Sequence, residues 1–114
     1  MQRSELRLRI QDMLDAVAEI QTFTAGLSSE AFRDDALTMR AVEYNFVVLG
    51  EAARNVPADA RTRYPLVPWL QMIGLRNVIV HQYRRADPDV LGDTVQNGFP
   101  TLVPLLREIL EREP

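Results

Sequence analysis

The segment Trp69–Arg85 reads WLQMIGLRNVIVHQYRR and contains the only tryptophan and the only histidine of this chain. It lies within residues 60–86, a region with five arginines and no aspartate or glutamate. The whole chain of 114 residues has a formal net charge of −3, so the rest of the chain is strongly acidic. A positively charged segment on an acidic protein predicts a specific anionic partner.

Apolar residues recur in this segment at the spacing of an α-helix, at positions 69, 72, 73, 79, 80 and 83. Leu75 and Val78 add a second apolar side. Pro68 can occupy a first helical position, where its missing N–H is no loss, and no further proline follows until Pro88. A helix that is apolar on several sides is either central in its fold or in contact with a second subunit. Gly74 would let a neighbouring backbone approach this helix closely.

Polar residues interrupt the apolar pattern of this helix. Arg76 lies within the apolar stripe, about 20° from Tyr83, and a buried arginine is costly unless it is paired or faces a polar cleft. Asn77 and His81 are four residues apart, so Asn77 can orient the imidazole. Arg76 and His81 lie about 140° apart, with a rise of roughly 7.5 Å. Either the helix ends or distorts near His81, or two copies share one site in a dimer.

A second charged residue interrupts an apolar face in the helix predicted at residues 35–55. Glu51 stands among Tyr44, Val47, Val48 and Ala52, as Arg76 does in its own stripe. A Glu51–Arg76 pair would neutralise both charges together and support the site structurally. Gly50, next to Glu51, permits close packing of two helices.

Helical patterns account for most of the remaining chain, and no strand pattern appears. Asn97, Gly98 and Pro100 predict a kink or break near residues 97–100. The pattern predicts an all-α fold in which residues 1–114 form one antiparallel bundle of four to five helices, the last of them kinked. The other predicted helices are residues 4–27 capped by Ser4, 29–34 capped by Ser29, one turn at 58–63, and 88–111 with Asp87 as cap and Pro88 as first residue.

Composition excludes several kinds of protein. There is no cysteine, so the chain has no disulfide, no zinc–thiolate site and no thiol nucleophile. No apolar run is long enough for a membrane span, and the N-terminal residues are too polar for a signal peptide. We therefore expect a cytoplasmic protein. No convincing cluster of metal ligands is present, so we expect no metal and no other cofactor.

Together, the arginine and the histidine indicate chemistry on a phosphodiester. An imidazole can act as general base or general acid, and a guanidinium can hold a phosphate and stabilise developing negative charge. These groups suit metal-free attack of an RNA 2′-hydroxyl on the adjacent phosphodiester, which DNA cannot undergo. One histidine cannot be base and acid at once, whereas two copies facing each other in a dimer supply both. In the competing interpretation His81 is a structural histidine, Tyr83 is a core residue, and Arg84 and Arg85 form a solvated helix end.

The spacing of Arg, His and Tyr in this segment resembles HEPN domains of the HepT kind, whose local pattern is W-x-x-I-x-G-φ-R-N-x-x-x-H-x-Y, where φ is apolar. The resemblance extends upstream to LGEAARNVP at 49–57 and YPLVPW at 64–69, and downstream to residues 87–106. It therefore covers nearly the whole chain. Met72 replaces the usual aliphatic residue and Leu75 a common methionine, and neither affects the expected chemistry. The residues that match the pattern are Trp69, Met72, Gly74, Leu75, Arg76, Asn77, His81 and Tyr83.

The resemblance implies a metal-independent endoribonuclease that acts as the toxin of a toxin–antitoxin pair. Arg76 and His81 correspond to the catalytic pair of the family and Asn77 to its assisting residue. HepT-like toxins are typically homodimers encoded beside an MntA-like minimal nucleotidyltransferase. This antitoxin can silence the toxin by transferring AMP from ATP to the tyrosine that corresponds to Tyr83. Arg84 and Arg85 would then line the RNA-binding cleft. In the alternative interpretation the chain is a non-catalytic binding partner of such a nucleotidyltransferase.

Overall fold

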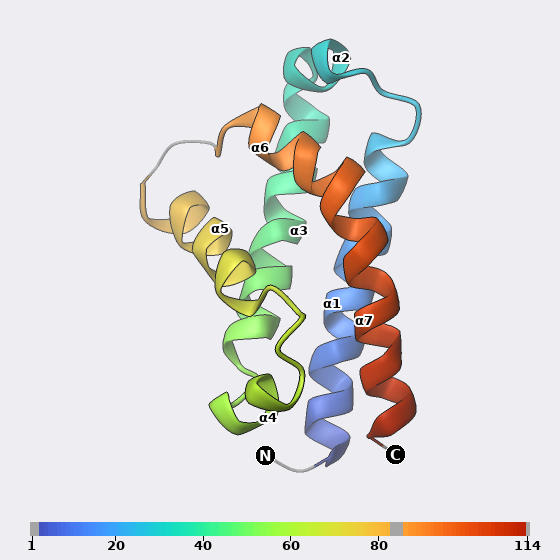
Figure 1. Cartoon of the computed structure of the whole chain (residues 1–114). Helices are drawn as coiled ribbons and strands as arrows, with labels where there is room; N and C mark the ends of the chain where they lie inside the picture. Colours follow the sequence, from blue (N-terminus) through green and yellow to red (C-terminus); the bar gives the residue numbers. More distant parts are fainter. Residues whose placement is uncertain (1–2, 83–85, 114) are drawn as a thin grey trace.

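The computed structural model describes residues 3–82 and 86–113 as a bundle of α-helices (Figure 1). No strand occurs in these two ranges, which confirms the predicted all-α class. None of their helices is long and apolar enough to cross a membrane. These ranges hold seven α-helices: four long ones, α1, α3, α5 and α7, and three of six residues, of which two were predicted separately and the third as the start of the last helix. In order, the elements are α1 (Arg3–Thr24), α2 (Ser29–Asp34), α3 (Ala36–Arg54), α4 (Ala58–Arg63), α5 (Trp69–His81), α6 (Pro88–Asp93), the π-helical segment η1 (Thr94–Gly98) and α7 (Phe99–Arg112).

The core forms where α1 packs against α3 and α7, and α3 also packs against α5 (Figure 1). The rings of Phe46 and Phe99 stack with their centroids 5.8 Å apart. Ile10, Met13 and Met39 belong to the same core and are fully buried. Burial of side chains of this size stabilises the fold by about 1.5–3 kcal/mol each, so this cluster holds the long helices in place.

Side-chain caps fix where three of the helices begin. Ser28 accepts a hydrogen bond from the backbone N–H of Ala31, so Ser28 caps α2, and the prediction of Ser29 was wrong by one residue. The Asp35 carboxylate accepts from the backbone N–H of Thr38, and this hydrogen bond lowers the pKa of Asp35. Asp87 caps α6, as predicted. These caps satisfy backbone donors that have no partner inside the helix.

The last helical region was predicted to kink or break near residues 97–100, and the structure has a π-helical segment there and no break. The chain remains helical there, because η1 joins α6 to α7 and the backbone N–H of Phe99 donates to the carbonyl of Thr94, five residues earlier. Pro100 lies in the first turn of α7, where a missing N–H is tolerated. Of the two predicted alternatives the break is therefore wrong, whereas the wider π-helical turn is an irregularity of the kind that kinks a helix.

The start of α5 is tied to the far end of the chain. The indole N–H of Trp69 donates to the carbonyl oxygen of Tyr64 at 3.0 Å. Oε1 of Glu113 accepts from the Tyr64 hydroxyl at 2.9 Å and from Nη2 of Arg63 at 3.0 Å. Burial, together with the contact to Glu113, raises the pKa of Tyr64. The connector before α5 is thereby held against the end of α7.

Helix α5 lies at the edge of the bundle (Figure 1), so the first predicted alternative, a central helix, was wrong, and the second, contact with a second subunit, stays a prediction. It packs mainly against α3, and only Trp69 and Met72 of its side chains are buried. Leu70, on its outer side, is 76% exposed, and Val80 is also exposed. The apolar pattern therefore correctly indicated more than one apolar side, but α3 covers only one of them.

Candidate active site

Arg76 lies on α5 where this helix touches α3. A Cβ on Gly50 would clash with Cβ of Arg76 and would lie 2.6 Å from the carbonyl oxygen of Met72. The close packing predicted for Gly50 is confirmed. Gly74 is different, because a Cβ there would have no atom within 4 Å. Within this chain the prediction that Gly74 allows a close helix contact was therefore wrong, since it lies on the uncovered side of α5.

Glu51 forms the ion pair with Arg76 that the two apolar stripes predicted. Nε of Arg76 lies 3.2 Å from Oε2 of Glu51. The Arg76 side chain is 16% exposed and that of Glu51 is 39% exposed, so Glu51 is less buried than its sequence position suggested. Both atoms are buried and neither makes an aligned hydrogen bond, so the contact is an ion pair at the edge of solvent. The pair fixes the guanidinium against α3.

Asn77 holds the same guanidinium from a second side. Nη1 of Arg76 donates to Oδ1 of Asn77 at 2.9 Å. The amide oxygen of Asn77 thus accepts a hydrogen bond from Arg76. The contact between Asn77 and the imidazole of His81 that the helical spacing indicated was therefore wrong. Nη2 of Arg76 has no hydrogen-bond or ion-pair partner among the described residues.

His81 is the last residue of α5, and its side chain is exposed. In residues 3–82 and 86–113 it has no hydrogen-bond or ion-pair partner. The predicted alternative that the helix ends near His81 is confirmed. A structural histidine is normally buried and satisfied, so this environment does not fit that interpretation. Arg76 lies against α3 while the His81 side chain is open to solvent, and Arg76 is held by Glu51 and Asn77 rather than by His81.

Arg54 is a neighbour of this site that the sequence interpretation missed. Its Nη2 lies 3.4 Å from Oε1 of Glu51, so Glu51 contacts Arg54 and Arg76 with its two oxygens. The spacing of Glu51 and Arg54, three residues apart on one helix, was the available signal. Tyr83, Arg84 and Arg85 lie outside the described residues, and their roles stay predictions.

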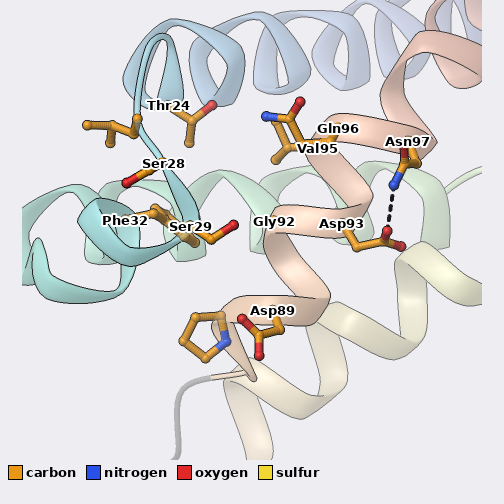
Figure 2. Close-up of a pocket in the computed structure, with 12 residues that line it drawn as sticks. Thr24, Ser28, Ser29, Phe32, Asp89, Gly92, Asp93, Val95, Gln96 and Asn97 are labelled. Carbon is orange, nitrogen blue, oxygen red and sulfur yellow. Dashed lines mark hydrogen bonds between the residues drawn. The ribbon is translucent and has the colours of Figure 1, made fainter.

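The hollow shown in Figure 2 lies elsewhere, between the end of α1, α2, α6 and η1. Its volume is about 310 Å³. Phe32 and Val95 give it an apolar part, and Asp89 and Asp93 give it acidic groups. Asp93 accepts a hydrogen bond from Asn97 at 2.6 Å. None of the predicted site residues that the structure describes lines this hollow, so the candidate site lies apart from it, along the contact of α3 and α5 and at the end of α5.

We expect Glu51→Gln to lower the free energy of unfolding by about 1 kcal/mol. The substitution keeps the shape of the side chain but leaves the largely covered charge of Arg76 without a counter-ion, and the exposure of Glu51 limits the effect. Glu108→Gln is the matched control, since Glu108 pairs with Arg112 at 2.9 Å on a more exposed surface. Urea denaturation of both variants measures the difference. Equal losses in the two variants would contradict a special role of the Glu51–Arg76 pair.

Comparison with known proteins places the chain in one family. The family model described as "Ribonuclease HepT-like" matches residues 13–109. "Probable ribonuclease HepT" of Thermococcus cleftensis is 33% identical over 82% of this chain and 84% of that protein. "Putative RNase MJ0127" of Methanocaldococcus jannaschii is 32% identical over 97% of this chain and 92% of that protein. No solved structure shows significant similarity. The chain, with Arg76, Asn77 and His81 in the pattern that resembles HepT, belongs to the ribonuclease HepT-like family.

Proposed function

We propose that this protein is a metal-independent endoribonuclease in which Arg76 and His81 act on the phosphodiester. The observation that supports this most is the state of Arg76. Glu51 holds its Nε, Asn77 holds its Nη1, and its Nη2 has no partner in the described part of the chain. An exposed, unpartnered His81 follows at the end of the same helix. Membership of a ribonuclease family agrees with this chemistry.

The reaction needs one base, one acid and one cation. The imidazole of one His81 takes the proton of the 2′-hydroxyl as O2′ bonds to phosphorus. The P–O5′ bond breaks, and an imidazolium gives its proton to the leaving 5′-oxygen. Arg76 stabilises the negative charge that develops on the non-bridging oxygens. The products are a 2′,3′-cyclic phosphate and a 5′-hydroxyl, and DNA is not a substrate because it lacks the 2′-hydroxyl.

A second copy of the chain would supply the second histidine. Leu70, Gly74, Asn77 and His81 share the outer side of α5 at helical spacing. Leu70 is largely exposed, and the space beside Gly74 is empty. Helix α5 of a second copy can pack on this side and bring two His81 side chains to one cleft, which Arg84 and Arg85 would line. Arg76 and His81 lie about 140° apart on a straight helix, so they do not share one face of α5. A homodimer removes this difficulty, because Arg76 of one copy can act together with His81 of the other.

The proposed biological role is that of a toxin held inactive by an MntA-like nucleotidyltransferase. In this proposal the antitoxin transfers AMP from ATP to the Tyr83 hydroxyl and releases pyrophosphate. Tyr83 follows His81 by two residues, so the added phosphate lies near the proposed site and competes with RNA for its arginines. Mass spectrometry after incubation with an MntA-like nucleotidyltransferase and ATP tests this step. An unmodified wild type, or equal modification of Tyr83→Phe, would contradict it.

RNA cleavage in EDTA tests the proposed activity. Purified wild type should cut a 5′-labelled RNA and leave 2′,3′-cyclic phosphate ends, while an oligonucleotide with 2′-deoxy nucleotides throughout stays intact. Mass spectrometry of the same sample establishes that Tyr83 carries no AMP. Absence of cleavage by this unmodified protein would reject the ribonuclease and favour the alternative, a non-catalytic partner of the nucleotidyltransferase.

A heterodimer of wild type and His81→Ala should be almost inactive. If one cleft needs the histidines of both copies, a single substitution removes either the base or the acid. Two affinity tags on co-expressed chains allow the heterodimer to be purified, and the doubly tagged wild-type dimer is its control. If each copy instead had its own independent site, the heterodimer would retain about half of the activity of the wild-type dimer. That result, or failure of the two tags to co-purify, would contradict the shared site.

A further inference from the structure

Glu51 contacts two arginines at once. Its Oε2 lies 3.2 Å from Nε of Arg76, and its Oε1 lies 3.4 Å from Nη2 of Arg54. One carboxylate cannot neutralise two guanidinium groups. The three side chains together therefore carry a net positive charge, and the unmatched charge is available to an anion.

The two arginines differ in how firmly they are held. Arg76 is 16% exposed and has a second partner in Asn77. Arg54 is 55% exposed, and Glu51 is its only partner in residues 3–82 and 86–113. An exposed ion pair between residues three apart on a helix contributes little to stability. Arg54 is therefore the member of this cluster that can turn to an incoming phosphate without disturbing the fold.

The packing of the two helices places Arg54 relative to the proposed reaction. Helices α3 and α5 run in opposite directions (Figure 1), and Gly50 lies against Met72 and Arg76. Arg54, one turn further along α3, is therefore on the side of Arg76 that faces away from His81. If the bond to be cut lies between Arg76 and His81, the anion that reaches Arg54 belongs to a neighbouring nucleotide.

We propose that Arg54 binds an RNA phosphate adjacent to the scissile one. This inference rests on the proposed ribonuclease function and adds a direction to it, because the strand then runs from the end of α5 past Arg76 to the end of α3. Arg54 is then a substrate-binding residue that contributes to affinity, and the reacting atoms lie beyond its reach.

A purely structural role would give Arg54 different properties. Arg54 is the last residue of α3, where a cation is favoured by the helix dipole. If that were its whole role, its removal would lower stability slightly and would affect every substrate equally. A phosphate contact instead affects only substrates that carry the charge at one particular linkage.

The test uses oligonucleotides in which every nucleotide except one carries a 2′-O-methyl group. Only the single ribonucleotide has a free 2′-hydroxyl, so only the bond next to it can be cut. In each member of the series one neighbouring phosphate is replaced by a neutral methylphosphonate. Arg54→Gln should raise KM about tenfold for the fully charged oligonucleotide with little change in kcat. The slope of the logarithm of the binding constant against the logarithm of the salt concentration should also become shallower, by the amount that corresponds to about one released counterion. Arg112→Gln is the matched control, because Arg112 ends α7, is similarly exposed and pairs with Glu108 one turn earlier.

The pattern across the series decides the inference. In wild type one neutral linkage should raise KM about as much as Arg54→Gln does, and in Arg54→Gln the same linkage should have no further effect. The proposed contact would be overturned if wild type and Arg54→Gln responded equally to each neutral linkage. It would also be overturned if Arg54→Gln and Arg112→Gln changed KM by the same amount. A fall in kcat on all substrates would show that Arg54 acts through Glu51 and would also overturn it. A wild type that cuts no RNA in EDTA overturns the proposed function together with this inference, whereas cutting that depends on Arg76 and His81 but not on Arg54 overturns this inference alone.

Discussion

His81→Ala should reduce kcat for RNA cleavage by about 10³-fold or more while leaving the fold intact. General acid–base catalysis is typically worth 10²–10⁴-fold, and a dimer of this variant loses both base and acid. The imidazole is exposed and unpartnered in the described structure, so its removal should change the free energy of unfolding by less than about 0.5 kcal/mol. Arg76→Ala should also abolish most of the activity, because stabilisation of developing charge accounts for roughly 10²–10³-fold.

Two controls separate chemistry from folding in these variants. Gln82→Ala changes the exposed residue next to His81 and should retain wild-type kcat. Arg76→Lys keeps the positive charge but lacks the planar fork that contacts both Glu51 and Asn77, so it should recover only a small part of the activity. Single-turnover cleavage in EDTA and urea denaturation are measured on the same preparations. A folded His81→Ala protein that cuts RNA at the wild-type rate would reject His81 as the catalytic base.

The starts of α5 and α6 could be predicted from sequence because local residues set them. Pro68 and Asp87 act within one turn of the helix that each precedes, and no distant contact is needed to explain them. The position of α5 at the edge of the bundle could not be predicted in this way. Its apolar pattern shows which sides avoid water but does not show whether this chain or a second copy covers them.

The site was predictable where charges had to be neutralised. Glu51 and Arg76 each interrupted an apolar stripe, and two opposite charges in such positions are expected to meet. The partner of Asn77 was predicted wrongly, because helical spacing allows a contact with His81 but does not choose between it and the adjacent Arg76. Arg54 was missed because its importance depends on Glu51 being shared between α3 and α5, which only the tertiary structure shows.

Gly50→Ala and Gly74→Ala should change stability in opposite directions. Both substitutions replace glycine within a helix, which favours the helix by about 1 kcal/mol. Within one chain the new methyl group at Gly74 enters empty space, so the stability of the single chain retains this gain. The methyl group at Gly50 clashes with Arg76 and with the backbone of Met72, and such overpacking costs about 1–3 kcal/mol or more. Because backbone atoms cannot move aside as a flexible side chain does, we expect the cost at Gly50 to exceed the gain.

The same pair of variants also tests how α3 positions Arg76. Separation of α5 from α3 in Gly50→Ala would lengthen the contact between Arg76 and Glu51, so ribonuclease activity should fall even under conditions where the protein is fully folded. Urea denaturation at several protein concentrations separates the stability of the chain from that of a dimer, in which Gly74 would lie at the interface. If Gly50→Ala is as stable and as active as wild type, then the helices are free to shift apart without consequence. In that case the contact at Gly50 cannot be what holds the guanidinium in place, and the Glu51–Arg76 pair alone would have to do so.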